Sequence, residues 1–142
     1  MDVLPLASGQ VAIIDETAVF LAGSPIAITL LVGAPDDYAA LIAPVPNGLT
    51  FATTVSGTTD IVHVFATRRA ELRTLLSGCR RKLKSTAAIW VSWPKKSSRV
   101  PTEVTEDVIR ELALPMGFVD VKVCAVTEVW SGLKLVLRKE LR

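Results

Sequence analysis

The chain has 142 residues, of which 50% are hydrophobic and 21% charged, and its formal net charge is +2. This composition excludes intrinsic disorder, and a chain of this length builds a core without disulfides or metal ions. Cys79 and Cys124 fall in different predicted elements, so the sequence contains no disulfide framework, which indicates a reducing compartment. We therefore expect residues 1–142 to form a single domain.

Charge is distributed unevenly along the chain. Residues 1–67 contain six acids and no lysine or arginine, so all 16 basic residues lie in residues 68–142. If the fold keeps the two parts separate, the basic part forms an anion-binding surface. The first basic residue is Arg68, which argues against a secretory signal peptide. Gly23-Ser24-Pro25 interrupts the apolar stretch Ala18–Val32, so we expect a cytoplasmic protein with no membrane partner.

Apolar runs and turn residues alternate through the first half of the chain. Val11–Ala22 fits either a short helix or a strand. Ile26–Val32 is a continuous apolar run rich in β-branched residues, which is typical of a strand buried on both faces of a parallel sheet. After the turn residues Gly33-Ala34-Pro35, a helix is expected over Asp37–Ile42 and a strand over Leu49–Val55.

The second half begins with another strand and a helix. Asp60 introduces the apolar strand Ile61–Ala66, and Thr67 is the expected cap of the helix that follows. A further strand covers Ala87–Trp93 and stops at Pro94. The buried side of the helix is defined by apolar residues at helical spacing: Leu72, Leu75, Leu76, Cys79 and Leu83.

A second helix and a strand pair complete the predicted fold. The helix is expected to begin at Pro101-Thr102, with acids such as Glu103 near its positive end. Val119–Val126 and Leu133–Leu137 pair most simply as a hairpin. This order predicts an α/β fold: a three-layer, Rossmann-like, mostly parallel sheet with a C-terminal antiparallel strand pair. Right-handed crossovers place helices on both faces of that sheet.

Several segments resemble an uncharacterised bacterial family, a domain of unknown function. They include Trp93-Pro94-Lys95-Lys96 and Trp130-Ser131-Gly132-Leu133. Lys84-Ser85-Thr86 departs from the Pro-Gly-Gly-like turn of that family, and the first 24 or so residues are atypical of it. The family has no established activity, so the resemblance implies no function. The segments that carry it are Asp60–Phe65, Thr67–Leu72, Trp90–Ser98, Thr105–Val108, Val119–Val126 and Trp130–Lys134.

The order of elements is also similar to the C-terminal half of class I methyltransferases, which bind S-adenosylmethionine. This similarity implies a methyltransferase-like fold and not an activity. A nucleotide-binding turn needs several glycines, whereas Val32-Gly33-Ala34-Pro35 has one glycine and a proline without an N–H donor. The next strand ends in Thr54–Gly57, without the acid that would hold a ribose. We therefore expect no cofactor, with S-adenosylmethionine as the alternative.

The candidate ligand site follows from strand order, because ligands of open α/β sheets bind at the carboxyl ends of the strands. Lysine, arginine, hydroxyl and indole groups gathered there form an anion or nucleotide pocket. The alternative is that the tryptophans only cover the sheet and the lysines only solvate a loop. The candidate ligand-binding residues are Gly33, Thr67, Arg68, Trp93, Lys95, Lys96, Ser97, Trp130 and Ser131.

Common catalytic chemistries find no support in the sequence. His63 is the only histidine and lies inside an apolar strand, so we interpret it as a core residue. One histidine and two distant cysteines do not form a zinc site, and no G-x-S-x-G motif accompanies His63 to make a serine triad. Both cysteines are explained by packing, and we assign no catalytic and no metal-binding residue.

The basic helix after Thr67 is a second candidate site. Its cations offer contacts to nucleic-acid phosphates, and Lys95, Lys96 and Arg99 would extend the patch. The alternative is a solvated helix face. The candidate nucleic-acid-binding residues are Arg69, Arg73, Arg80, Arg81 and Lys84.

Three functional hypotheses remain from the sequence. The first is a non-catalytic or vestigial Rossmann-like domain that binds a small anionic ligand or a protein partner at the carboxyl end of the sheet. The second is an enzyme that depends on S-adenosylmethionine or a nucleotide. The third is a nucleic-acid-binding accessory protein. The oligomeric state stays open.

Overall fold

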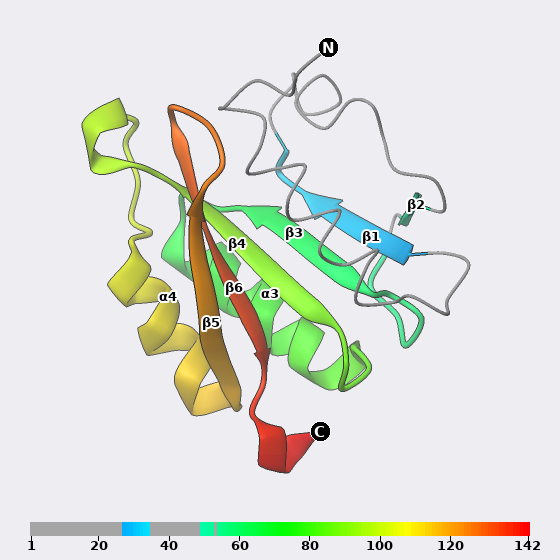
Figure 1. Cartoon of the computed structure of the whole chain (residues 1–142). Coiled ribbons are helices and arrows are strands. Elements are labelled where there is room, and N and C mark those ends of the chain that lie inside the picture. The colour runs from blue at the N-terminus through cyan, green and yellow to red at the C-terminus, as the bar shows by residue number, and fades with distance from the viewer. Residues whose placement is uncertain (1–26, 35–48, 53) are drawn as a thin grey trace.

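The computed structural model describes residues 27–34, 49–52 and 54–142, which build a six-stranded mixed sheet in the order β2-β1-β3-β4-β6-β5 (Figure 1). The first four strands are parallel to one another, while β6 is antiparallel to both β4 and β5. The strands are β1 (Ala27–Val32), β2 (Leu49–Ala52), β3 (Ile61–Phe65), β4 (Ala88–Pro94), β5 (Phe118–Ala125) and β6 (Trp130–Leu137).

The parallel strands form where continuous apolar runs were predicted. Every residue of β3 and of β4 is buried, as expected for strands covered on both faces. The predicted strand at 133–137 is extended in β6, which begins at Trp130 because Trp130 pairs with Pro94 of β4. The predicted helix Asp37–Ile42 and the ambiguous segment Val11–Ala22 lie outside the described residues.

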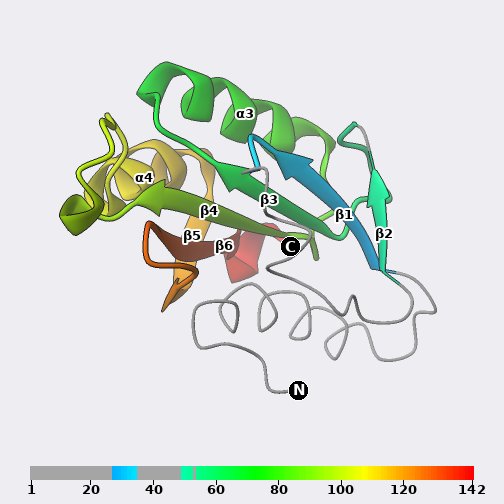
Figure 2. The same ribbon diagram turned by 90° about the horizontal axis from the view of Figure 1, so that it is seen from above.

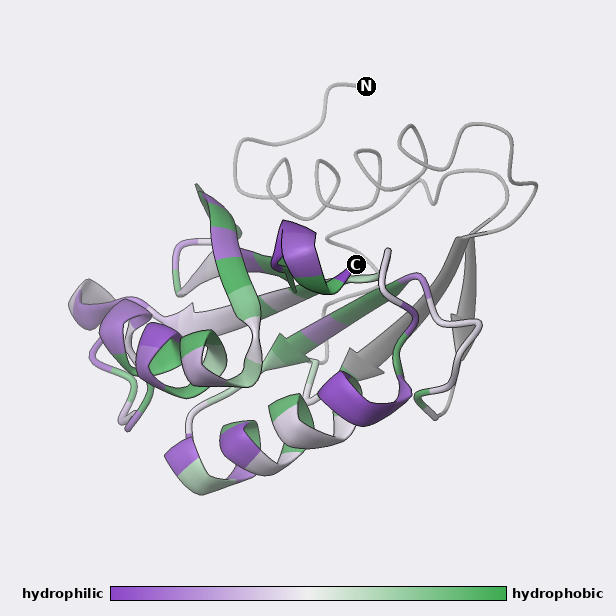
Figure 3. Ribbon diagram, turned by 90° about the horizontal axis from the view of Figure 1, so that it is seen from below, coloured by the Kyte–Doolittle hydropathy of each residue, from purple (hydrophilic) through white to green (hydrophobic). Residues whose placement is uncertain are grey.

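The helices α3 (Arg69–Lys82) and α4 (Glu106–Ala113) lie on the same face of the sheet (Figure 2). Both are amphipathic, with hydrophilic residues along their outer sides (Figure 3). Burial of each large apolar side chain stabilises the fold by about 1.5–3 kcal/mol. The buried helix residues are Leu72, Leu76 and Cys79 of α3 and Ile109, Leu112 and Ala113 of α4, all in one cluster with strand residues such as Val64, Val91 and Leu135.

The described residues therefore form two layers, a sheet and one layer of helices. The fold is α/β with a C-terminal antiparallel hairpin, as predicted, but no described residue supplies the helices that the three-layer prediction places on the opposite face. That opposite face carries its own buried cluster of Ile61, Trp90 and Val126, with Cys124 and Trp130 packed against it.

The start of α4 differs from the prediction. The helix begins at Glu106, and the Oγ1 atom of Thr105 caps it by accepting a hydrogen bond from the N–H of Val108 at 3.2 Å. The Oγ1 atom of Thr102 instead accepts from the N–H of Val104 at 3.0 Å, which keeps this stretch in a turn. The prediction that the helix starts at Pro101-Thr102 was therefore wrong by about one turn.

Within the described ranges, no helix is both long and apolar enough to cross a bilayer.

We predict that Gly33→Ala destabilises the fold. Gly33 has φ +69°, and a Cβ atom there would lie 2.8 Å from the carbonyl oxygen of Phe65. A left-handed conformation with this overlap costs about 1–3 kcal/mol. Urea unfolding followed by circular dichroism measures the loss. Gly57→Ala is the matched control, because nothing lies within 4 Å of its Cβ position. Equal stability of the two variants would contradict the prediction.

Candidate functional site

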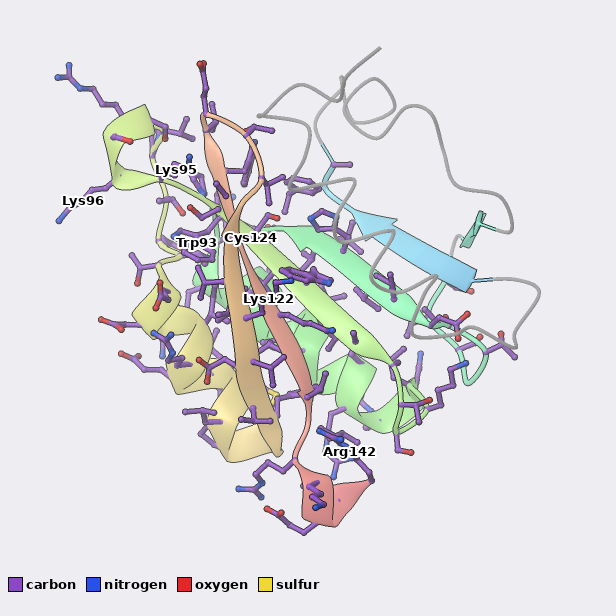
Figure 4. All side chains as sticks on the ribbon, in the orientation of Figure 1. Trp93, Lys95, Lys96, Lys122, Cys124 and Arg142 are labelled. Carbon is purple, nitrogen blue, oxygen red and sulfur yellow. The ribbon has the colours of Figure 1, made fainter. Side chains whose placement is uncertain are left out.

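The carboxyl ends of β1, β3 and β4 lie side by side, and β6 begins beside the end of β4. Val32 pairs with Val64, Phe65 with Ser92, and Pro94 with Trp130. The topology thus brings the segments after β1, β3 and β4 and the start of β6 to one end of the sheet, as the sequence predicted. We call this end the carboxyl end, and Figure 4 shows Lys95 and Lys96 there.

The loop after β4 is held by backbone hydrogen bonds. The N–H of Lys95 donates to the carbonyl of Val129 at 2.6 Å, which ties the loop to the β5–β6 turn. The Oγ of Ser98 donates to the carbonyl of Lys95 at 2.6 Å and closes the short 3₁₀ turn Lys96–Ser98. Arg99 follows in the left-handed conformation, with φ 61°. The loop therefore has a defined shape.

Three cations of this loop, Lys95, Lys96 and Arg99, are called the loop cations below. Lys95 is half-buried, while Lys96 and Arg99 are exposed, as is Ser97 between them. Among the described residues, none of the three lies within ion-pair distance of a carboxylate. Within the described part of the chain, this loop therefore carries three cations without an ion-pair partner, which makes it attractive to anions.

The two tryptophans predicted for the site have different environments. Trp93 is 8% exposed and packs in the core under the helices, so its indole offers no stacking surface, which corrects our prediction for this residue. Trp130 is half-buried on the opposite face, with its ring edge-on to Phe65 at a centroid distance of 5.0 Å. Ser131 pairs with Trp93 and is also half-buried. Trp130 is therefore the tryptophan available at this end.

An internal carboxylate occupies the N-terminus of α3. Glu103 accepts a hydrogen bond from the N–H of Arg69 on its Oε1 at 3.0 Å, and its own N–H donates to the carbonyl of Thr67 at 2.8 Å. The prediction that Thr67 caps the helix was wrong, because Arg68 is the N-cap residue and its side chain makes no capping bond. Arg68 itself is exposed and lies 3.9 Å from Glu71, a surface pair of little energetic weight.

His63 and Ser92 form a buried pair on the sheet face opposite the helices. The Nε2 atom of His63 lies 2.9 Å from the Oγ of Ser92, and both residues are 0% exposed. Phe65 stacks on the imidazole at a centroid distance of 4.5 Å. Desolvation by burial lowers the pKa of His63 to about 3, so the ring is neutral at physiological pH. The structure places His63 in the core, as its position in the strand predicts.

Among the described residues, neither Cys79 nor any cluster of metal-ligating side chains forms a reactive site. Burial raises the pKa of the Cys79 thiol to about 11, which keeps it in the unreactive protonated form. No group of three or more potential metal ligands occurs within the described ranges. Arg110 binds Glu106 at 2.6 Å and Asp120 at 3.0 Å, so it ties α4 to β5.

Several of the side chains predicted to bind nucleic acid on and after α3 already bond to other protein groups. Arg69 binds Glu111 at 3.0 Å, Lys84 pairs with the buried Asp60, and Arg81 donates to Ser77 at 3.1 Å. Arg73 is exposed. Because α3 runs from the carboxyl end of the sheet to the opposite end, its last cations lie far from the loop cations and do not form one patch with them.

The described residues lack the features with which a nucleotide-binding turn would hold S-adenosylmethionine. Glycine in such a turn lets the backbone approach the ligand, but the open side of Gly33 faces the carbonyl of Phe65. Beyond β2, Ser56 and Thr59 bond to each other and no carboxylate occurs before Asp60, which is 7% exposed and pairs with Lys84. The groups that would hold a ribose are therefore missing from these positions.

Comparison with solved structures identifies the fold. A methyltransferase from Aquifex aeolicus that depends on S-adenosylmethionine has a TM-score of 0.56 at 13% identity, over 97% of this chain and 100% of that one. The magnesium protoporphyrin IX methyltransferase of Synechocystis, solved with bound S-adenosylmethionine, has a TM-score of 0.56 at 13% identity, over 92% of this chain and 81% of that one. Mitomycin 7-O-methyltransferase has a TM-score of 0.64 at 11% identity, over 92% of this chain and 55% of that one.

These structures are similar to this chain in the class I methyltransferase fold, at low sequence identity. No protein-family model and no curated protein matches the chain. The resemblance to an uncharacterised bacterial family therefore stays a prediction.

We predict that stability falls as the pH drops below about 6.5, because His63 has a pKa of 6.5 when unfolded and about 3 when folded. As the pH falls, the unfolded state binds the proton first. The slope of the free energy of unfolding against pH then approaches about 1.4 kcal/mol per pH unit. Urea unfolding between pH 7 and pH 5.5 measures this slope. Because His63 is the only histidine, His63→Gln should flatten it. A slope that survives this substitution would contradict the assignment.

We also predict that Glu103→Ala destabilises the protein by about 0.5–2 kcal/mol, because it removes the acceptor at the N-terminus of α3. The exposed Glu128 gives a control of equal charge, and Glu128→Ala should change stability by less than about 0.5 kcal/mol. Thermal unfolding compares the two, and indistinguishable midpoints would refute a capping role for Glu103.

Proposed function

We propose that this chain is a non-catalytic domain with a methyltransferase fold that binds a small anionic ligand at the carboxyl end of its sheet. The loop cations carry this proposal. They are three positive charges without a carboxylate partner among the described residues, on a loop whose shape is fixed by hydrogen bonds to Val129 and within residues 95–99. The loop lies where ligands of open α/β sheets bind.

The side chains of the loop indicate the chemical class of the ligand. Arg99 offers a planar guanidinium that binds phosphate or carboxylate through two nitrogens, and Lys95 and Lys96 add compact charges. Ser97 adds an exposed hydroxyl that donates a hydrogen bond. These groups favour a phosphorylated small molecule over a neutral one.

The absence of a reactive set among the described residues supports a binding role. His63 and Ser92 are fully buried and neutral, and Cys79 is held as a thiol. The carboxylate of Glu103 accepts a hydrogen bond from the N–H of Arg69 at the N-terminus of α3. A general acid or base needs to reach its substrate, and none of these groups is placed to do so.

A second candidate function is S-adenosylmethionine-dependent methyl transfer, which the fold similarity favours. It requires the cofactor to bind without a glycine-rich turn and without a ribose acid at the positions described above. The two functions predict different ligands, so one titration series separates them.

We predict that pyrophosphate or ATP stabilises the protein and that Lys95→Ala, Lys96→Ala and Arg99→Ala together reduce this stabilisation by about half or more. A ligand at about one hundred times its Kd adds roughly 2.7 kcal/mol, which raises the Tm by several degrees. Thermal shift and calorimetric titration measure binding of pyrophosphate, ATP, inorganic phosphate and S-adenosylmethionine. The triple variant should weaken Kd at least about tenfold, or about 1.4 kcal/mol.

The control removes three charges elsewhere, with Arg81→Ala, Lys82→Ala and Lys139→Ala, and should leave Kd within about twofold. Equal weakening by both variants would mean that net charge alone attracts the anion. Saturable binding of S-adenosylmethionine, unaffected by either variant, would favour the second function.

A further inference from the structure

A second basic surface lies at the opposite end of the sheet. It contains Arg80 and Arg81, two of the residues predicted to bind nucleic acid, but the sequence pattern did not bring them together with residues 138–142. The end of α3 meets the 3₁₀ turn Lys139–Leu141 that follows β6. Figure 4 shows Arg142 at this end, with Lys95 and Lys96 at the other. We call it the amino-end surface, and its cations are Arg80, Arg81, Lys82, Arg138, Lys139 and Arg142.

Gly117 joins the two parts of this surface. A Cβ atom at Gly117 would lie 2.6 Å from the Cδ1 of Leu141 and 3.4 Å from the Nε of Arg80, so both side chains pack on this glycine. Its carbonyl also accepts a hydrogen bond from the N–H of Arg138 at 2.9 Å. Cations that are about 60 residues apart in the chain therefore share one surface.

Two arginines of the surface are fixed by bonds to backbone carbonyls. The Nε of Arg80 donates to Met116 at 2.9 Å, and the Nε of Arg142 donates to Leu137 at 2.8 Å. Within the described residues, neither guanidinium pairs with a carboxylate. The bonds hold each group in place while leaving its terminal nitrogens for an external acceptor, and such prior ordering lowers the cost of binding.

Charge at this surface is nearly all of one sign. Arg138 lies 3.7 Å from Glu140, the one carboxylate side chain among residues 138–142. Lys84 is not counted because it is paired with the buried Asp60. The remaining cations have no internal counter-charge in the part of the chain that the structure describes, so the surface attracts a polyanion.

The surroundings favour nucleic acid over an acidic protein. Protein interfaces are built around clusters of apolar or aromatic anchors, whereas among the described residues this end of the sheet offers two exposed large apolar side chains, Leu141 at 38% and Leu114 at 40%. Among the residues that the structure describes, no aromatic ring is exposed at this end, where Phe118 is 3% exposed, so unpaired bases find no ring there to stack on. We propose that the amino-end surface binds the phosphate backbone of double-stranded nucleic acid without reading its sequence.

This proposal does not depend on the ligand at the carboxyl end, and the same pair of variants separates the two. The surface variant carries Arg81→Ala, Lys82→Ala and Lys139→Ala, all at exposed residues outside the anchoring bonds. The loop variant carries Lys95→Ala, Lys96→Ala and Arg99→Ala, so each variant loses three positive charges. Circular dichroism and Tm establish that both are folded.

Fluorescence anisotropy of the full chain with labelled duplexes of about 20 base pairs tests the proposal, with DNA and RNA of one arbitrary sequence and the matching single strands. We expect saturable duplex binding that the surface variant weakens at least about tenfold and the loop variant less than about twofold. The slope of log K against log salt should fall by about one for each phosphate that the surface variant no longer neutralises. The DNA and RNA duplexes, measured side by side, show which is preferred.

Four results would overturn the proposal. The first is that the duplex does not bind saturably at low salt, and the second is that both variants lose affinity equally. The third is that single strands bind more tightly than the duplex, and the fourth is that poly-glutamate binds as tightly as the duplex.

Arg142→Lys tests the fixed guanidinium separately, because lysine keeps the charge but loses the bond to Leu137. This variant should weaken duplex binding without changing the slope of log K against log salt. If it binds the duplex as tightly as the unaltered chain, the guanidinium of Arg142 has no part in the proposal.

Discussion

The structure depends most on the pairing of β4 with two neighbouring strands, β3 and β6, that run in opposite directions. All seven residues of β4 are buried, with β3 parallel on one side and β6 antiparallel on the other. Its odd-numbered residues, such as Val91, enter the core under the helices, and its even-numbered residues, such as Trp90, face the other side of the sheet. The same pairing sets Lys95 beside Val129, which fixes the candidate site. One strand thus determines both the core and the position of the loop cations.

Local patterns in the sequence were sufficient for the strands and for the carboxyl end of the sheet. The continuous apolar runs Ile61–Ala66 and Ala87–Trp93 identified β3 and β4 to within one residue at each end, because strands buried on both faces leave few polar positions. Helical spacing of Leu72, Leu76 and Cys79 likewise identified the buried side of α3. Strand order then brought the ends of these strands together by a general rule of parallel sheets.

Interactions between distant residues could not be predicted in this way. Glu103 was interpreted through its nearest helix, but it caps α3 from 34 residues away, and no local signal distinguishes the two roles. Trp93 was placed in the site because it ends a strand, although its position in the alternation turns it into the core. Arg80 and Arg81 were predicted to bind nucleic acid, but their grouping with residues 138–142 was missed, because Gly117 brings the end of α3 close to the chain after β6. Tertiary contacts decided the role of Glu103 and the make-up of the amino-end surface, whereas the burial of Trp93 follows the period of two along β4.

The close contact between Gly33 and the carbonyl of Phe65 has a consequence for reading related sequences. A glycine after the first strand of this fold is commonly understood as a mark of nucleotide binding, because it opens the backbone to a ligand. Here the same absence of a side chain lets two adjacent strand ends approach each other. Selection on packing alone would therefore retain glycine at this position in descendants that bind nothing there. Its presence in an alignment is evidence about how the strand ends fit together, and a cofactor has to be inferred from other residues.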